Sequence, residues 1–144
     1  SITEFYVEDM PMRIYFYRKC ARAADESVLD GIRGEMVDRF GPLPEETGRF
    51  FHELFIRLEL KRLGIGRLTV KGSALTLQFE SNSPVPPDRL VALVRRRPTD
   101  FKLAPPMELI TSLPRGKEAA ESAQLILRDL RSALLPAAPE PSKT

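Results

Sequence analysis

The hydrophobic period of this 144-residue chain changes once, next to Gly64 and Gly66. Before these glycines, apolar residues recur at intervals of three and four, which is the spacing of a buried stripe on a helix. After them, apolar and polar residues alternate, which is typical of a half-buried strand. A chain with both periods in separate blocks is predicted to fold in the α+β class.

Three helices are predicted before the glycines. The first runs from Met12 to Ala24, the second follows an N-cap at Asp25, and the third begins at Pro44. Gly41 ends the second helix, since glycine suits a C-terminal cap and the prolines after it cannot continue a helix. The apolar residues expected on the buried stripes are Ile14, Tyr15 and Tyr17, then Val28, Leu29, Ile32, Met36 and Phe40, then Phe51, Leu54, Phe55 and Leu58.

The second half is predicted to hold a small mixed or antiparallel sheet with two further helices. One domain is expected over residues 1–135, followed by a disordered, proline-rich tail over residues 136–144. The expected elements are a hairpin with Leu68, Val70, Leu75, Leu77 and Phe79 on one face, a helix from Pro87 to the Arg95–Arg97 run, strands at 101–103 and 107–111, and a helix from about Gly116 to Leu135.

Composition excludes several classes of protein. Apolar residues make up 42% of the chain, which is enough for a core, and no apolar run is long enough for a membrane span. The acidic start lacks the pattern of a secretory signal, and the single Cys20 cannot form an internal disulfide, so we expect a cytoplasmic protein. The first residue is Ser1 rather than Met, which suggests a piece of a longer protein.

Few residues of this chain are typical of catalysis. His52 is the single histidine and lies within a predicted amphipathic helix, and Cys20 has no histidine near it in the sequence. No phosphate-binding loop of the G-x-x-x-x-G-K-[ST] type is present. We therefore predict that the chain is not an enzyme by itself and holds no cofactor or metal. A hydrolase that uses His52 with an acidic residue stays open as an alternative.

The strongest basic feature is the run Arg95, Arg96 and Arg97 at the predicted end of a helix. Cations in this place complement the helix dipole and stay solvated, which is the simpler interpretation. Residues 65–144 hold 12 Lys and Arg against 8 Asp and Glu, so the alternative function is a small basic module that binds nucleic acid directly through this half. Against it, the whole chain has a net charge of only +2, and no aromatic residues interleave with the arginines.

A second charged group lies on the predicted second helix. Glu35, Asp38 and Arg39 are spaced so that they form an exposed patch, while Ile32 and Met36 point into the core. A Glu35–Arg39 pair that contributes about 0.2–0.5 kcal/mol, together with a solvated Asp38, would by itself explain this spacing.

Three motifs at compatible spacings resemble the C-terminal domain of the bacterial transcription-repair coupling factor. The similarity covers about residues 4–135, and its most specific part is the run from Asp38 to Pro44. The motifs are Tyr6-x-x-Asp9-x-x-x-Arg13-x-x-x-Tyr17-Arg18, then Glu35-x-x-Asp38-Arg39-Phe40-Gly41-Pro42-Leu43-Pro44, then Leu63-Gly64-Ile65.

The resemblance implies a regulatory role that composition does not show. The parent of such a domain is a large ATP-dependent DNA translocase that releases stalled RNA polymerase and recruits excision repair, with its motor in other domains. The C-terminal domain is expected to dock on an N-terminal module similar to UvrB, to mask the surface that UvrA would use and to restrain the motor. The positions that match the family's docking contact are Glu35, Asp38 and Arg39, and a candidate secondary basic patch is Arg95, Arg96 and Arg97.

Overall fold

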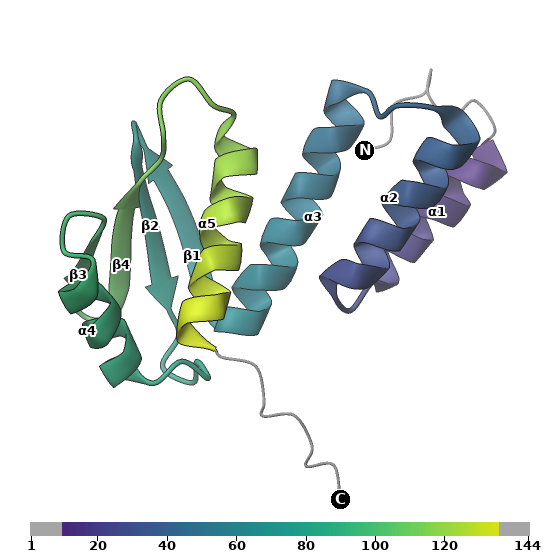
Figure 1. Cartoon of the computed structure of the whole chain (residues 1–144). Helices are drawn as coiled ribbons and strands as arrows, with labels where there is room; N and C mark the ends of the chain where they lie inside the picture. Colours follow the sequence, from purple (N-terminus) through teal and green to yellow (C-terminus); the bar gives the residue numbers. More distant parts are fainter. Residues whose placement is uncertain (1–9, 136–144) are drawn as a thin grey trace, which may run out of the picture. The chain divides into compact units, whose positions relative to one another are not determined.

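The computed structural model describes residues 10–135, which form five helices and four strands (Figure 1). Their order confirms the predicted α+β class, with three helices first and then a sheet with two further helices. The chain divides into two compact units, residues 1–58 (unit 1) and residues 59–144 (unit 2), and helix α3 contributes to both. The elements are α1 (Met10–Arg22), α2 (Glu26–Phe40), α3 (Glu45–Leu63), β1 (Ile65–Lys71), β2 (Ala74–Phe79), α4 (Pro87–Arg96), β3 (Phe101–Ala104), β4 (Glu108–Ser112) and α5 (Ala119–Leu134).

One predicted helix start differs from the structure, and one predicted segment lies outside the described residues. Helix α5 begins at Ala119 rather than near Gly116, because Gly116 adopts a φ of 77°, outside the helical region. The predicted tail, residues 136–144, lies outside the described residues. The assignment of residues 1–135 to one domain stays a prediction.

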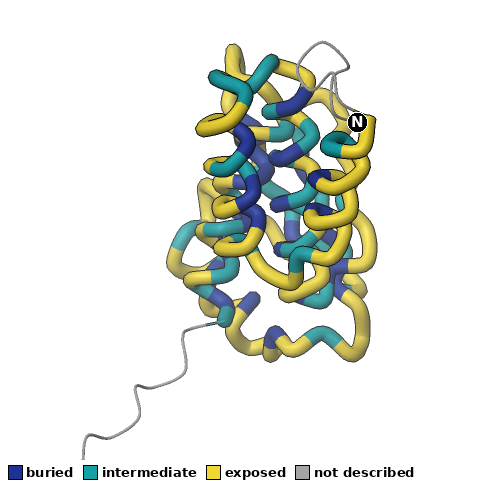
Figure 2. Tube along the Cα trace, turned by 90° about the vertical axis from the view of Figure 1, so that its right-hand side faces the viewer, coloured by how far each residue is buried: buried dark blue, intermediate teal, exposed yellow. Residues whose placement is uncertain are grey.

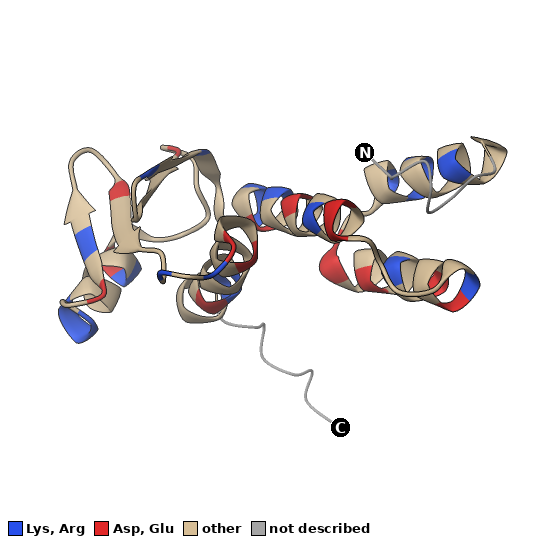
Figure 3. Cartoon of the chain, turned by 90° about the horizontal axis from the view of Figure 1, so that it is seen from above, with Lys and Arg blue, Asp and Glu red and all other residues tan. Residues whose placement is uncertain are grey.

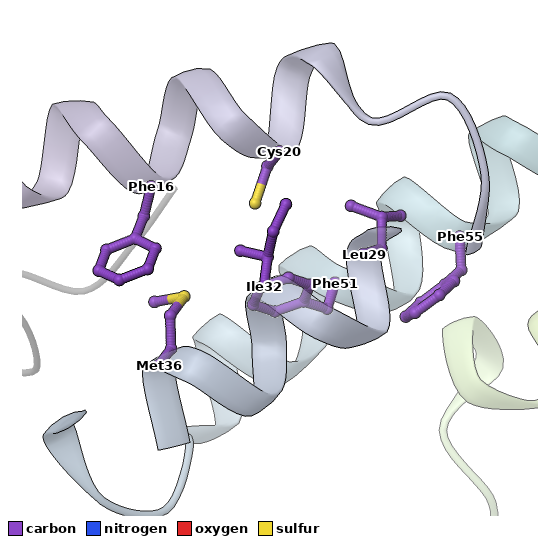
Figure 4. Close-up of a cluster of buried hydrophobic side chains, with 7 residues drawn as sticks. All are labelled: Phe16, Cys20, Leu29, Ile32, Met36, Phe51 and Phe55. Carbon is purple, nitrogen blue, oxygen red and sulfur yellow. The ribbon is translucent and has the colours of Figure 1, made fainter. Parts of the chain in front are cut away.

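Unit 1 is held together by one cluster of buried apolar side chains from α1, α2 and α3. Figure 4 shows these side chains pointing toward one another between the helices. Along each helix, buried residues alternate with exposed ones (Figure 2), as expected for amphipathic helices. The cluster consists of Phe16, Cys20, Leu29, Ile32, Met36, Phe51 and Phe55.

The buried face of α1 is not the predicted one. Phe16 is fully buried, whereas Ile14, Tyr15 and Tyr17 are 46%, 38% and 53% exposed. Successive residues of a helix point about 100° apart, so the neighbours of Phe16 cannot share its direction. The run of apolar residues at 14–17 hides this periodicity in the sequence. On α2, Val28 is likewise 44% exposed, so it does not belong to the buried stripe.

Both predicted ends of α2 are confirmed. The side chain of Asp25 accepts a hydrogen bond of 3.1 Å from the backbone N–H of Val28, which satisfies one of the open donors of the first turn. At the other end, Gly41 has a φ of 89° and donates its N–H to the Val37 carbonyl. This geometry fixes the length of the helix that carries the candidate docking residues.

Unit 2 contains a four-stranded antiparallel sheet in the order β1-β2-β4-β3. Leu75, Leu77 and Phe79 of β2 are buried, as predicted for one face of the hairpin. Leu68 and Val70 pair with Leu77 and Leu75 and so share this face as predicted, although Leu68 is only half-buried and Val70 is 45% exposed. The reason is that β1 lies at an edge of the sheet and has a neighbouring strand on one side only.

Gly64 joins α3 to β1 in a way that requires glycine. Its φ is 68°, and a Cβ atom built on it would lie 2.6 Å from the backbone of Ser83. The Gly64 carbonyl accepts a hydrogen bond of 2.8 Å from the backbone N–H of Glu80, and the Ser83 hydroxyl donates to the Leu63 carbonyl at 2.6 Å. The change of hydrophobic period in the sequence therefore coincides with a tight junction.

Candidate docking surface

Helix α2 presents the three predicted docking residues away from the core of unit 1. Asp38 and Arg39 are exposed and Glu35 is half-buried, while Ile32 and Met36 on the other side of the helix are buried. The capped ends of α2 and its packed inner face hold this surface on a rigid element. The expected division of α2 into an inner and an outer side is confirmed.

Glu35 is neutralised by two cations within unit 1. Its Oε2 lies 3.4 Å from Nζ of Lys19 on α1, and its Oε1 lies 3.3 Å from Nη2 of Arg39 one turn along α2. Lys19 also lies over the Tyr15 ring, 4.8 Å from its centroid. The contact with Tyr15, followed by that with Glu35, raises the pKa of Lys19. Lys19 and Arg39 must therefore move away before a cation of a partner can replace them beside the Glu35 carboxylate.

Asp38 differs from its two neighbours in the predicted patch. Arg39 contacts Glu35 and places its Nη1 3.9 Å from Sδ of Met12, so its guanidinium is held within unit 1. The Asp38 carboxylate is exposed and forms no hydrogen bond or ion pair with any other residue in the 10–135 range. Glu35 and Arg39 thus form an ion pair. The Asp38 carboxylate is open, by which we mean that it is exposed and has no ion-pair partner within residues 10–135.

The three arginines at the end of α4 also divide into two kinds. Arg97 contacts Asp100 at 3.1 Å and Asp129 at 3.0 Å, and its guanidinium lies 4.9 Å from the centroid of the Phe101 ring. The hydrogen bonds to Asp129 and then to Asp100 raise the pKa of Arg97. Arg95 and Arg96 are exposed, and neither contacts an acidic residue of the described chain. Of the three arginines at the end of α4, Arg95 and Arg96 are thus the two that are available to a ligand.

The two units carry opposite net charges. Unit 1 has 8 Lys and Arg against 11 Asp and Glu, whereas unit 2 has 14 against 9. Within α3 the charges are separated as well: Figure 3 shows acidic residues at its start and basic residues at its end. This order favours the helix because it complements the helix dipole. A partner of unit 1 is therefore expected to present basic groups.

The two candidates for catalysis, Cys20 and His52, both belong to unit 1. Burial raises the pKa of the Cys20 thiol to about 11, which keeps it in the less nucleophilic protonated form at neutral pH. His52 is half-buried on α3. Among residues 10–135, no group of three or more His, Cys, Asp or Glu residues is placed to hold a metal ion. No helix in this range is long and apolar enough to cross a membrane.

Residues 1–90 match the model of the TRCF domain family. The chain belongs to this family. Curated relatives of this TRCF domain include the transcription-repair-coupling factor of Myxococcus xanthus, 27% identical over 95% of the chain, and that of Escherichia coli, 28% identical over 87%. The matched regions are 12% and 11% of these two relatives, so the TRCF domain spans a small part of their length.

A solved structure has the same fold as this TRCF domain. It is the crystal structure of the C-terminal domain of a transcription-repair coupling factor, with a TM-score of 0.73 over 92% of this chain and 87% of that chain. The two sequences are 18% identical, so this likeness concerns the fold. The resemblance to the C-terminal domain of transcription-repair coupling factors, stated from the three motifs, is confirmed by these matches.

Two interactions of this TRCF domain were not predicted from the sequence. The contact of Lys19 with Glu35 joins residues that are 16 positions apart. Asp129, the partner of Arg97, is 32 positions away from it. No local spacing rule reaches such pairs, because helix periodicity relates only residues three or four apart. The contact of Arg97 with Asp129 and that of Glu35 with Lys19 therefore appear only after folding.

Proposed function

We propose that this chain is the regulatory docking domain of a transcription-repair coupling factor. Its α2 surface docks on the UvrB-like N-terminal module of the same parent chain and covers the surface that UvrA would bind. In this docked state the ATP-dependent DNA translocase motor of the parent is restrained. Binding of the parent to stalled RNA polymerase on DNA releases the domain, and excision repair is then recruited.

The observation that carries the proposal is the open carboxylate of Asp38. It lies on the capped and rigid α2, in the unit with more acidic than basic residues. An exposed acid without a cation partner within the described residues is ready to meet an arginine or lysine of another module. Glu35 and Arg39, which already form a pair, extend the charged surface and orient the partner.

A charged surface of this kind suits a contact that must open. Exposed ion pairs contribute only about 0–1 kcal/mol each and weaken as salt rises, so docking through them is reversible. A covalent tether between the two modules raises their effective concentration, which keeps a weak contact closed at rest. A change in the geometry of the parent is then sufficient to separate the modules.

The test is a charge reversal in the full-length parent, Asp38→Lys, with UvrA binding and ATP turnover as the two readouts. The matched control is Glu53→Lys, which makes the same change of charge at an exposed position of α3 in the same unit. We expect Asp38→Lys to raise the affinity for UvrA at least tenfold and to raise turnover, and the control to change neither. Unaltered UvrA binding by a folded Asp38→Lys protein would contradict the proposal.

Deletion of the whole domain gives the upper limit of the same effect. The parent without this chain should bind UvrA at least as tightly as the Asp38→Lys variant and should hydrolyse ATP at least as fast. If deletion raises ATP turnover but leaves UvrA binding unchanged, the domain restrains the motor without masking the UvrA surface.

A second candidate function is direct contact with nucleic acid through the end of α4. It is favoured by Arg95 and Arg96, which are exposed and without acidic partners among residues 10–135. Phosphate contacts release counterions, so binding should fall steeply as salt rises. Filter binding of duplex and single-stranded DNA to the chain, repeated for Arg95→Glu with Arg96→Glu, tests this candidate. Binding that is equal for both proteins at all salt concentrations would refute it.

A further inference from the structure

Two connecting segments of unit 2 meet at one end of its sheet, the β1–β2 turn and the β4–α5 loop (Figure 1). The backbone N–H of Leu113, directly after β4, donates a hydrogen bond of 2.7 Å to the carbonyl of Ser73 in the turn. Lys71, the last residue of β1, lies opposite Ala74, which in turn lies opposite Ser112 at the end of β4. Lys71 and the residues that follow β4 therefore lie at the same end of the sheet.

Four exposed cations belong to this end of the sheet. Two of them are in the β4–α5 loop, and one is the last residue of β1. The fourth is on β3, opposite Ile110, which precedes the last residue of β4 by two positions and so shares its face. We call this group the basic end of unit 2, and it consists of Lys71, Lys102, Arg115 and Lys117.

The charge of the basic end is not neutralised within the described chain. None of its four cations forms an ion pair with another residue of the 10–135 range. Asp100, which lies near Lys102 in the sequence, is held by Arg97 at 3.1 Å. Glu118 follows Lys117 directly, so the basic end has four cations against one acid. Glu108 starts β4, about 13 Å from the end of that strand and so beyond the screening length of about 10 Å at 0.1 M salt.

We propose that the basic end of unit 2 binds the phosphate backbone of duplex DNA. A duplex carries one negative charge per about 1.7 Å of its axis, and cations that neutralise its phosphates release counterions and so gain affinity. The exposed aromatic residues of the described chain, Tyr15 and Tyr17, belong to unit 1. The bases of a single strand would thus find no exposed ring to stack on at the basic end, which favours a duplex.

This binding is expected to be independent of DNA sequence, because contacts to phosphate do not read the bases. The inference goes beyond the proposed function, since it needs neither the α2 surface nor the arginines at the end of α4. It adds a site in unit 2 through which the domain itself can hold the DNA.

The test is fluorescence anisotropy of a labelled duplex titrated with the 144-residue chain over a range of salt concentrations. Lys71→Gln with Arg115→Gln removes one cation from each of the two segments. We expect the affinity at low salt to fall at least tenfold, and the slope of log K against log salt to become shallower by about 2, because two phosphate contacts are lost.

The matched control is Lys61→Gln with Arg62→Gln. It removes the same two charges at exposed positions near the end of α3, which precedes the other end of β1. We expect this control to change the affinity less than threefold and to leave the slope unaltered. Thermal unfolding confirms that the variants fold. If the first variant is unfolded, Lys102→Gln with Lys117→Gln replaces it, and the same losses are expected.

The inference is overturned if the wild-type chain does not bind the duplex at low salt, or if the two double variants bind it equally well. Loss of binding in Arg95→Glu with Arg96→Glu, but not in the Lys71 and Arg115 variant, would place the DNA contact at the end of α4 instead. Tighter binding of single-stranded DNA than of the duplex would assign the basic end to a single strand. Binding of polyglutamate without binding of the duplex would assign it to an acidic protein partner. Each of these three results would also overturn the inference, whereas the test of docking through Asp38 is unaffected by them.

Discussion

The surface of α2 and the end of α4 look alike in the sequence, since each is a short group of charged residues on a helix. In the structure, each group contains members that are paired within the chain and members that are not. On α2, Glu35 is paired with Lys19 and Arg39, and Asp38 is open. The paired residues stabilise the unit that carries them, and the open residue is available to a partner.

The end of α4 repeats this division with the opposite sign. Arg97 is held by Asp100 and Asp129, while Arg95 and Arg96 are open to solvent. The difference between the two surfaces is what lies beside the open charges. The open acid of α2 lies in one row with a groove that α1 and α2 line together, whereas the open arginines line a hollow formed by α4 alone, with Val91 and Ala92. Charge alone therefore does not distinguish the two surfaces, but the number of helices that line the neighbouring hollow does.

A third charged group is buried, in contrast to the exposed charged residues of α2 and α4. Glu59 on α3 is 1% exposed at its side chain, and its Oε2 lies 3.2 Å from Nε of Arg131 on α5. Arg131→Met should destabilise unit 2 by about 3–5 kcal/mol, since it removes the cation beside a buried carboxylate. Urea unfolding of the 144-residue chain measures this. The double variant Glu59→Leu with Arg131→Met should recover most of the loss, and equal stability of the single and double variants would contradict this explanation.

The second prediction compares the open and the paired acid of α2. Asp38→Asn should weaken docking about fivefold, whereas Glu35→Gln should weaken it less than twofold, because two cations of unit 1 already neutralise Glu35. UvrA binding to the full-length parent measures both. Each substitution keeps the shape of the side chain and removes one charge, so the two variants control each other. An effect of Glu35→Gln as large as that of Asp38→Asn would show that the internal pairs do not matter for docking.

The third prediction compares the paired and the open arginines of α4. Arg97→Ala should lower the free energy of unfolding of unit 2 by about 0.5–1 kcal/mol, through loss of two exposed ion pairs and the contact with the Phe101 ring. Arg96→Ala, as the control, should leave it unchanged. Chemical unfolding at low and high salt tests this, and the difference between the two variants should shrink as salt rises.

The smallest effect is expected at Lys19. Lys19→Met removes the cation of α1 that lies beside Glu35 and keeps most of the apolar stem of the side chain. Glu35 is then more available to the partner, so docking should tighten and UvrA binding should weaken about twofold. Arg18→Met is the control, since Arg18 is exposed on the same helix and has no ion pair within residues 10–135. Weaker docking of Lys19→Met would mean that Lys19 itself contacts the partner.

Much of the fold could be predicted because its signals are local. Asp25, Gly41 and the change of period at Gly64 fix element ends through backbone geometry, and each acts over a few residues. The buried face of α1 could not be derived in the same way. Four consecutive apolar residues from Ile14 to Tyr17 give no preferred direction, and packing against α2 and α3 selects Phe16.

The candidate site could be predicted only in part, for the same reason. The spacing of Glu35, Asp38 and Arg39 placed them on the outer side of α2, and the structure agrees. The second cation beside Glu35 is Lys19, which belongs to another helix, so the spacing within α2 does not reveal it. The groove beside them depends on how α1 crosses α2, and no pattern within one helix contains that information.

Within residues 10–135, the order β1-β2-β4-β3 leaves β1 and β3 without a neighbouring strand on their outer sides. Such edges can recruit strands from other molecules and lead to aggregation. Here β1 has a register shift between Ile65 and Arg67, and lysines occupy both edge strands at Lys71 and Lys102. Irregular pairing and charge both disfavour strand addition. The domain is therefore expected to stay monodisperse at high protein concentration, even when it is produced apart from its parent.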